Sequence, residues 1–334
     1  MLSRIVLRSG RLSADILKKF IVHFKQLRCL ELSDGVFLSD FALWEVLGAL
    51  PSLTHLTLSA NGINPDPVHV TVPENSNSDW QSGGPKYFDA LKGLCVTGPF
   101  FLILGFIDSP CLKSIEVYPV INPVLNEHDH EDKDLFISSM TVVASKWSQS
   151  LKNLVIGSNS SGILLRNSDV ISKCLILLMD LHEIQTFHLI GWRMENMDDD
   201  VRRLVKSWPK LRTLKMIPFN ETFISLSTLR IIAENCPELR HLEIQLDTST
   251  IPSFETSSKS LHHNLEFLAV GRHKDPNNTI TQTKLRLQRQ IQVTRYLDLL
   301  FPYLKCVLES ELDDEFWLGI RDLVELCQDA RRVK

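Results

Sequence analysis

The composition of this 334-residue chain excludes several functional classes. A hydrophobic fraction of 44% and a charged fraction of 23% are those of an ordinary folded protein. A formal net charge of −4 supplies no overall field to attract nucleic acid or an anionic membrane, and no apolar run approaches the roughly 20 residues of a membrane span. We therefore expect a folded protein that binds neither nucleic acid nor membranes.

The cysteines indicate a reducing compartment. There are seven of them, an odd number, scattered along the chain without a Cys-x-x-Cys pair. This pattern predicts neither a disulfide framework nor a zinc site, so we expect free thiols and a cytoplasmic or nuclear protein. Arg4, Arg8 and Arg11, with no acid before Asp15, leave a mitochondrial presequence as the alternative.

A recurring motif, Leu-x-x-Leu-x-Leu, sets the expected fold. Successive copies begin at Leu27, Leu53, Leu91, Leu112, Leu151, Ile184, Leu211, Leu239, Leu265 and, in degraded form, Leu304. Each unit of this kind contributes one short strand whose apolar side chains are buried only against a stacked neighbour. The sequence predicts an α/β leucine-rich-repeat solenoid, a ribonuclease-inhibitor-like horseshoe of short parallel strands and helices with about ten irregular repeats.

The spacing of the motifs predicts the organisation of the chain. Between Leu53 and Leu91 the spacing is 38 residues, and between Leu112 and Leu151 it is 39, against a usual repeat of roughly 20 to 29. The excess suggests insertions at residues 61–86 and 119–134 of a single domain covering residues 1–334. A helix over residues 313–334, with acids at its start and basic residues at its end, is expected to cap the solenoid.

Helical periodicity precedes several of the motifs and stops at a proline. Residues 40–50 end at Pro51, residues 200–208 at Pro209, and residues 226–236 at Pro237. Proline cannot continue a helix, because its ring replaces the backbone donor and clashes with the preceding turn. We predict helices over these ranges and one shorter helical stretch at residues 13–23.

The side chains between the motif leucines form the candidate binding surface. Because strand side chains alternate between two faces, these residues are expected to project from the concave side of the sheet. The candidates are Glu31, His55, Thr57, Glu116, Tyr118, His188, Lys215, His241, Glu243 and Gln245. Their mixed charge and moderate polarity suit an unidentified protein partner and not a phosphate backbone.

No motif in the sequence supports an enzyme or a cofactor. His128 and His130, flanked by acids, contain ligand types that a divalent metal prefers, and a metal-dependent activity there is one alternative; the other is a solvated loop. The acids Asp198, Asp199 and Asp200 precede a predicted helix and favour N-capping over cation binding. We predict a non-enzymatic scaffold without cofactor or metal.

Three stretches resemble the leucine-rich repeats of F-box proteins, especially the F-box-like families of mushroom-forming fungi. They are residues 235–244 (Asn-Cys-Pro-Glu-Leu-Arg-His-Leu-Glu-Ile), residues 94–115, and residues 295–304 with Leu326-Cys327-Gln328. The resemblance implies the substrate-recognition part of a cullin-type ubiquitin ligase receptor. An F-box, which would dock the cullin adaptor, needs a longer segment with a Leu-Pro opening before the first repeat, and only 26 residues without that dipeptide precede Leu27. A stand-alone repeat module unrelated to ubiquitination is therefore the alternative.

Overall fold

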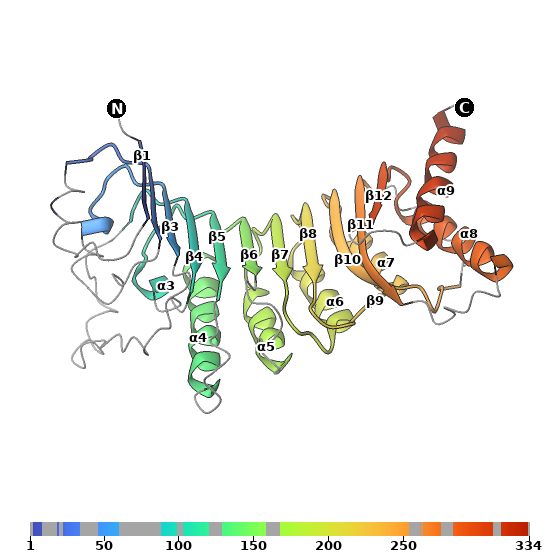
Figure 1. Ribbon diagram of the computed structural model, residues 1–334, viewed down its shortest axis with the longest axis horizontal. Helices are drawn as coiled ribbons and strands as arrows, with labels where there is room; N and C mark the ends of the chain where they lie inside the picture. Colours follow the sequence, from blue (N-terminus) through green and yellow to red (C-terminus); the bar gives the residue numbers. More distant parts are fainter. Residues whose placement is uncertain are drawn as a thin grey trace. The chain divides into compact units, whose positions relative to one another are not determined.

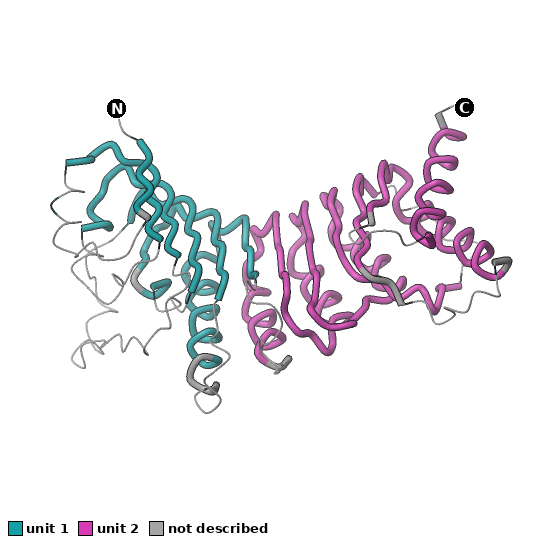
Figure 2. The backbone as a smooth tube through the Cα atoms, viewed as in Figure 1, with its two compact units in different colours: residues 1–164 teal, residues 165–334 magenta. Residues whose placement is uncertain are grey.

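A computed structural model describes most of the chain. The described residues are 3–8, 19, 23–33, 46–59, 88–98, 103–119, 129–157, 168–253, 261, 263–274, 283–309 and 315–332. Two compact units cover residues 1–164 and 165–334 (Figure 2). Each unit consists of short parallel strands that alternate with helices.

The described residues of unit 1 form six parallel strands that neighbour one another in chain order (Figure 1). They are β1 (Arg4–Arg8), β2 (Cys29–Ser33), β3 (His55–Ser59), β4 (Gly93–Thr97), β5 (Ser114–Tyr118) and β6 (Asn153–Gly157). The pairing is in register, so that Leu30 of β2 lies beside Leu56 of β3, and Leu56 beside Leu94 of β4. Motif leucines at the same repeat position therefore stack from strand to strand.

The apolar core of unit 1 lies on one face of these strands. The second and fourth residues of β2, Leu30 and Leu32, are 2% and 5% exposed, whereas the residues between them are partly exposed. Helices α3 (Ile103–Phe106) and α4 (Asp129–Trp147) belong to this unit, and Met140 and Trp147 of α4 are buried. Alternating burial along a strand is the pattern of a sheet covered on one face.

Unit 2 repeats this plan. Its strands β7 (Thr186–Ile190), β8 (Thr213–Ile217), β10 (His241–Asp247), β11 (Phe267–Lys274) and β12 (Cys306–Glu309) pair in parallel, and the short β9 (Ile224–Ser225) pairs with the end of β10. Its helices are α5 (Ser168–Leu178), α6 (Met197–Ser207), α7 (Leu226–Asn235), α8 (Thr283–Leu300) and α9 (Glu315–Arg332).

Buried side chains before the strands hold neighbouring repeats together in both units. In unit 1 the Trp147 indole N–H donates to the Ser109 carbonyl at 2.9 Å, and the Ser109 hydroxyl donates to the Leu91 carbonyl at 2.7 Å. In unit 2 the Trp208 indole donates to the Leu178 carbonyl at 3.2 Å, and His263 Nε2 lies 2.7 Å from the Cys236 carbonyl. These bonds satisfy buried turn carbonyls that would otherwise be costly to desolvate.

All ten predicted motifs form strands, which confirms the leucine-rich-repeat fold class. Two further strands, β1 and β9, were not predicted. Arg4 and Arg8, two of the arginines in the predicted presequence alternative, are the first and last residues of β1, which pairs with β2.

The predicted helices and insertions have mixed outcomes. Helices α6, α7 and α9 match three predicted ranges, while residues 46–48 are the helical part of the predicted 40–50 helix that is described. The insertion at 61–86 lies outside the described residues, as does the predicted helical stretch 13–23 apart from Lys19 and His23. Helix α4 begins at Asp129, so the end of the predicted 119–134 insertion is helical and is not a loop.

Candidate protein-interaction surface

The first, third and fifth residues of each strand form what we call the open face of the sheet. Their side chains are mostly half-buried or exposed, in contrast to the motif leucines between them. Nine of the ten candidate residues occupy this face with side chains at least partly exposed; Gln245 is the exception. The two units carry different chemistry on it.

A half-buried ion pair lies on the open face of unit 2. Lys215 of β8 and Glu243 of β10 are register partners, and their charged atoms are 2.8 Å apart. Their side chains are 29% and 24% exposed, so the pair is partly shielded from water while one side of it remains accessible. His188 of β7 is the register partner of Lys215 and continues the same row.

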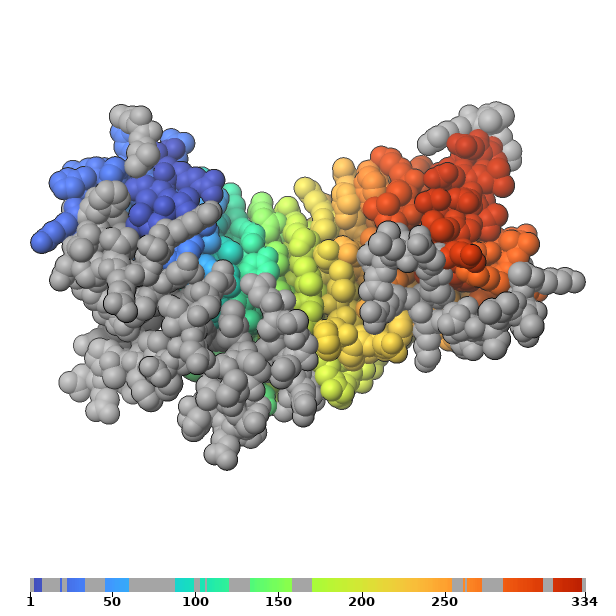
Figure 3. Space-filling model, in the orientation of Figure 1, coloured from blue at the N-terminus to red at the C-terminus, as the bar shows by residue number. Residues whose placement is uncertain are grey.

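Aromatic and apolar side chains adjoin this ion pair. The His241 ring stacks on the Phe267 ring of the next strand, with centroids 4.8 Å apart and planes 4° from parallel. Leu308 of β12 is 49% exposed and pairs in register with Ala269 of β11. Figure 3 draws the described residues of unit 2 as a surface coloured from yellow-green to red along the sequence. Aromatic side chains such as Phe267 are enriched at the centres of interfaces, whereas Lys and Glu are more common at the polar rim.

Gln245 differs from the prediction because it is buried, with 6% of its surface exposed. The pairing of β10 with β11 shifts register between Ile244 and Leu246, which is a β-bulge. One extra residue on β11 at this point disrupts the simple alternation of exposed and buried positions. The amide of Gln245 donates to the Pro218 carbonyl at 3.5 Å, so this residue supports the end of β10.

The open face of unit 1 is more acidic. Glu116 accepts a hydrogen bond from the Tyr118 hydroxyl at 3.4 Å, and Glu31 lies 3.4 Å from Arg4. Cys95 lies beside Glu116 in register, and burial, followed by the charge of Glu116, raises the pKa of its thiol to about 11. Cys95 is therefore a protonated, unreactive thiol at neutral pH.

Two glycines on this face make room for neighbouring rings. A Cβ at Gly93 would lie 2.7 Å from Cδ2 of His55, and a Cβ at Gly157 would lie 2.5 Å from Cε1 of Tyr118. Both glycines are buried under these rings. The positions of His55 and Tyr118 thus depend on glycine in the adjoining strand. Thr57, the last of the unit 1 candidates, is partly exposed between Glu31 and Cys95 in register.

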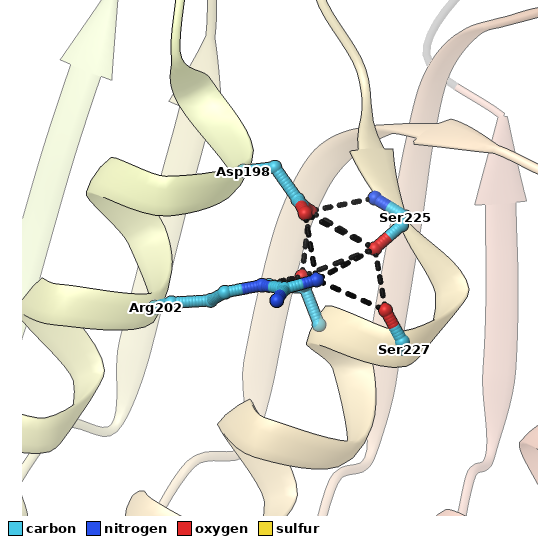
Figure 4. A network of polar contacts seen from close by, with 5 residues as sticks. Asp198, Arg202, Ser225 and Ser227 are labelled. Carbon is cyan, nitrogen blue, oxygen red and sulfur yellow. Dashed lines mark hydrogen bonds and ion pairs between the residues drawn. The ribbon is translucent and has the colours of Figure 1, made fainter.

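The acids at 198–200 are structural, but they are not N-caps of their own helix. Helix α6 begins at Met197, and its N-cap Asn196 makes no side-chain capping bond. Asp198 instead binds the start of α7: Oδ1 accepts from the Ser225 N–H at 2.8 Å and the Thr228 hydroxyl at 2.5 Å, and Oδ2 lies 2.8 Å from Arg202 (Figure 4). The N–H of Ser225, the N-cap residue of α7, is therefore bonded by Asp198 of the preceding repeat.

Asp200 ties α6 to the helix on its other side. Its carboxylate accepts from the Ser172 hydroxyl of α5 at 2.8 Å, and it is 4% exposed. Burial raises the pKa of Asp200, and the Ser172 bond opposes that shift. Asp198 and Asp200 therefore link three successive helices, an arrangement that local sequence signals did not reveal.

The described residues contain no group that matches the metal-site alternative. No cluster of three or more His, Cys, Asp or Glu side chains suited to a metal occurs within the described ranges. His128 lies outside those ranges, and His130 is placed in α4 by its backbone alone. All seven cysteines fall in described ranges and are free thiols. Searched over the same ranges, no helix is long and apolar enough to cross a membrane.

Comparisons with known proteins show little beyond a loose structural likeness. No family model matches the chain, and no curated protein is detectably similar in sequence. A Bacteroides fragilis protein solved by a structural genomics consortium aligns at a TM-score of 0.40 and 16% identity, over 68% of this chain and 59% of that one. TLR13, solved in complex with ssRNA13, aligns at 0.39 and 17%, over 81% of this chain and 39% of that one. The chain thus spans less than two thirds of both.

Proposed function

We propose that this protein is a non-enzymatic interaction scaffold that binds a segment of a partner protein on the open face of unit 2. Leucine-rich-repeat folds typically serve as binding scaffolds, because stacked strands present one continuous surface without a catalytic pocket. The observation that carries the proposal is the half-buried Lys215–Glu243 pair beside the His241–Phe267 stack and exposed Leu308.

This group of residues has the features that interface energetics favour. An aromatic stack offers apolar area at small entropic cost, and a charged pair fixes orientation because a partner must complement both signs. Since Lys215 and Glu243 already neutralise each other, burying them beneath a partner is less costly than burying either charge alone. The surface therefore suits a partner with mixed polarity.

A charge exchange tests the proposal. In the variant Lys215→Glu with Glu243→Lys the pair can re-form with reversed polarity, so the fold should retain its melting temperature. A partner bound to this face then meets like charges, which cost several kcal/mol. Quantitative affinity capture from the native cell extract should lose the specific partner on the order of tenfold or more.

The matched control is a second exchange in the same unit. Lys210 and Glu183 form an ion pair at 2.5 Å in the turns before the strands, away from the open face. Glu183→Lys with Lys210→Glu should leave capture unchanged. Equal capture by wild type and both exchanges would contradict a binding site on the open face of unit 2.

The narrower form of this proposal is the substrate-recognition part of a cullin-type ubiquitin ligase receptor. Its support is the resemblance of residues 235–244, 94–115 and 295–304 to F-box-like repeat proteins. Recovery of the cullin adaptor in the same capture would support it, and recovery of other proteins without the adaptor would favour a stand-alone module. The seven free thiols support placing this binding in the cytoplasm or nucleus.

A further inference from the structure

Basic residues occupy the position just before successive strands of unit 1. They are Arg28 before β2, Lys92 before β4, Lys113 before β5 and Lys152 before β6. Arg28, Lys92 and Lys113 are exposed and Lys152 is half-buried. We call Lys92, Lys113 and Lys152 the lysine row, because they stand on three adjacent strands.

The backbone fixes the spacing of the lysine row. The Lys113 N–H donates to the Lys92 carbonyl at 2.9 Å, and the Lys152 N–H donates to the Lys113 carbonyl at 2.9 Å. Each lysine also follows a motif leucine that is fully buried. The three side chains therefore start about 4.8 Å apart, the separation of neighbouring strands.

The equivalent row of unit 2 is neutralised by its own acids. Arg212 pairs with Glu238 at 2.9 Å, Lys305 pairs with Glu266 at 2.8 Å, and Arg240 approaches Glu266 to 4.0 Å. Glu238 lies three residues before β10, and Glu266 lies directly before β11. In unit 2, each of these three basic residues before a strand therefore has a carboxylate of the neighbouring repeat within 4.0 Å.

Unit 1 supplies no such carboxylate. The residues just before its motif leucines are Gln26, Ser52, Ala90, Cys111 and Ser150, none of them acidic. Exposed Asp89 and Asp108 lie in the turns nearby, yet within the described part of the chain neither forms an ion pair with the lysine row. Like charges on side chains rooted on adjacent strands repel one another, and a bound anion relieves that repulsion.

We propose that the lysine row of unit 1 is a docking edge for an acidic segment of a partner protein. Acids at alternate positions of an extended peptide project to one side roughly 7 Å apart, which is wider than the roughly 4.8 Å between the roots of the lysines, and the long, flexible lysine side chains can spread to meet them. A nucleic acid is less suited, because the row contains no aromatic side chain on which bases could stack. The site is separate from the one proposed for unit 2.

Fluorescence anisotropy with a labelled ten-residue peptide of alternating Glu and Ser tests this proposal. The full chain should bind the peptide, more weakly as NaCl is raised. The triple variant Lys92→Gln, Lys113→Gln, Lys152→Gln should lose affinity on the order of tenfold, since an exposed ion pair contributes a factor of roughly 1.5 to 5. Its melting temperature should stay the same, because the three side chains form no hydrogen bond or ion pair with any described residue.

A matched triple variant separates a local site from the overall charge. Arg212→Gln, Arg240→Gln, Lys305→Gln removes the same three charges, taking the net charge from −4 to −7 in both cases, and should leave peptide affinity within about twofold. Equal losses in the two variants, or no binding by wild type at millimolar peptide, would overturn the proposal. Tighter, row-dependent binding of a ten-nucleotide single-stranded RNA than of the peptide would also overturn it, in favour of a nucleic-acid edge.

Discussion

Replacing Asp198 should loosen the start of α7 in the next repeat along the chain. Asp198→Ala removes the acceptor for the Ser225 N–H and the Thr228 hydroxyl, and it leaves Arg202 without its carboxylate. The predicted effect is a loss of stability together with faster exchange of the Ser225 amide hydrogen.

The size of the loss follows from the contacts. A hydrogen bond to a charged group contributes roughly 1.5 to 3 kcal/mol when shielded, and the Asp198 side chain is 32% exposed, so solvent reduces each bond to about half of that. An exposed i,i+4 ion pair adds about 0.3 to 0.5 kcal/mol. Asp198→Ala should therefore cost about 2 to 3 kcal/mol. Asp198→Asn keeps the Oδ1 acceptor and loses the charge, so it should cost about 1 kcal/mol.

Urea unfolding followed by circular dichroism measures these costs, and hydrogen exchange at Ser225 localises them. Asp199→Ala is the matched control, because Asp199 is an exposed acid in the same helical turn with no bond to α7. It should cost less than about 0.5 kcal/mol. If Asp198→Ala and Asp198→Asn each lower the free energy of unfolding by less than about 0.5 kcal/mol, the proposed role of Asp198 in holding the start of α7 is wrong.

Three further predictions concern buried or crowded groups. Burial lowers the pKa of His263 from its ordinary value of 6.5. The unfolded chain therefore binds more protons than the folded one, and stability should fall as pH drops through 6.5 towards the folded pKa. The urea midpoints measured at pH 7.5 and pH 5.5 should differ less in His263→Gln than in the wild type. Gly157→Ala should cost about 1 kcal/mol by displacing the Tyr118 ring, and Tyr118→Ser in the same chain should restore the melting temperature. Burial raises the pKa of Cys174 and of Cys236 to about 12, so iodoacetamide at pH 8 should label exposed Cys111 and spare both, as mass spectrometry of tryptic peptides would show.

The repeat motif predicted the strands because its signal is local and recurs ten times. Each motif places two apolar side chains on the same strand face, and in-register stacking follows from that periodicity alone. The strand β1 was missed although Leu2, Ile5 and Leu7 have the same spacing. Arg4 and Arg8 adjoin Ile5 and Leu7, and an arginine-rich start is also typical of a targeting segment.

Other features were beyond local patterns because they depend on partners distant in sequence. The burial of Gln245 follows from a bulge in β11, and the strand pattern around Gln245 is otherwise regular. Asp198 binds residues 27 and 30 positions away. The sequence shows the lysines before the strands of unit 1, but whether a cation at this position is paired depends on an acid about 26 to 39 residues away, as in Arg212–Glu238 and Lys305–Glu266.

Site-specific photo-crosslinking tests most directly whether the open face of unit 2 binds the partner. A photo-reactive residue replaces Leu308 on the open face or, as the control, Ile176 on helix α5; these side chains are 49% and 50% exposed. The account predicts that irradiation in the native extract links a discrete partner protein to position 308 and not to position 176. Equal crosslinking at the two positions, or crosslinking at position 176 alone, would contradict it.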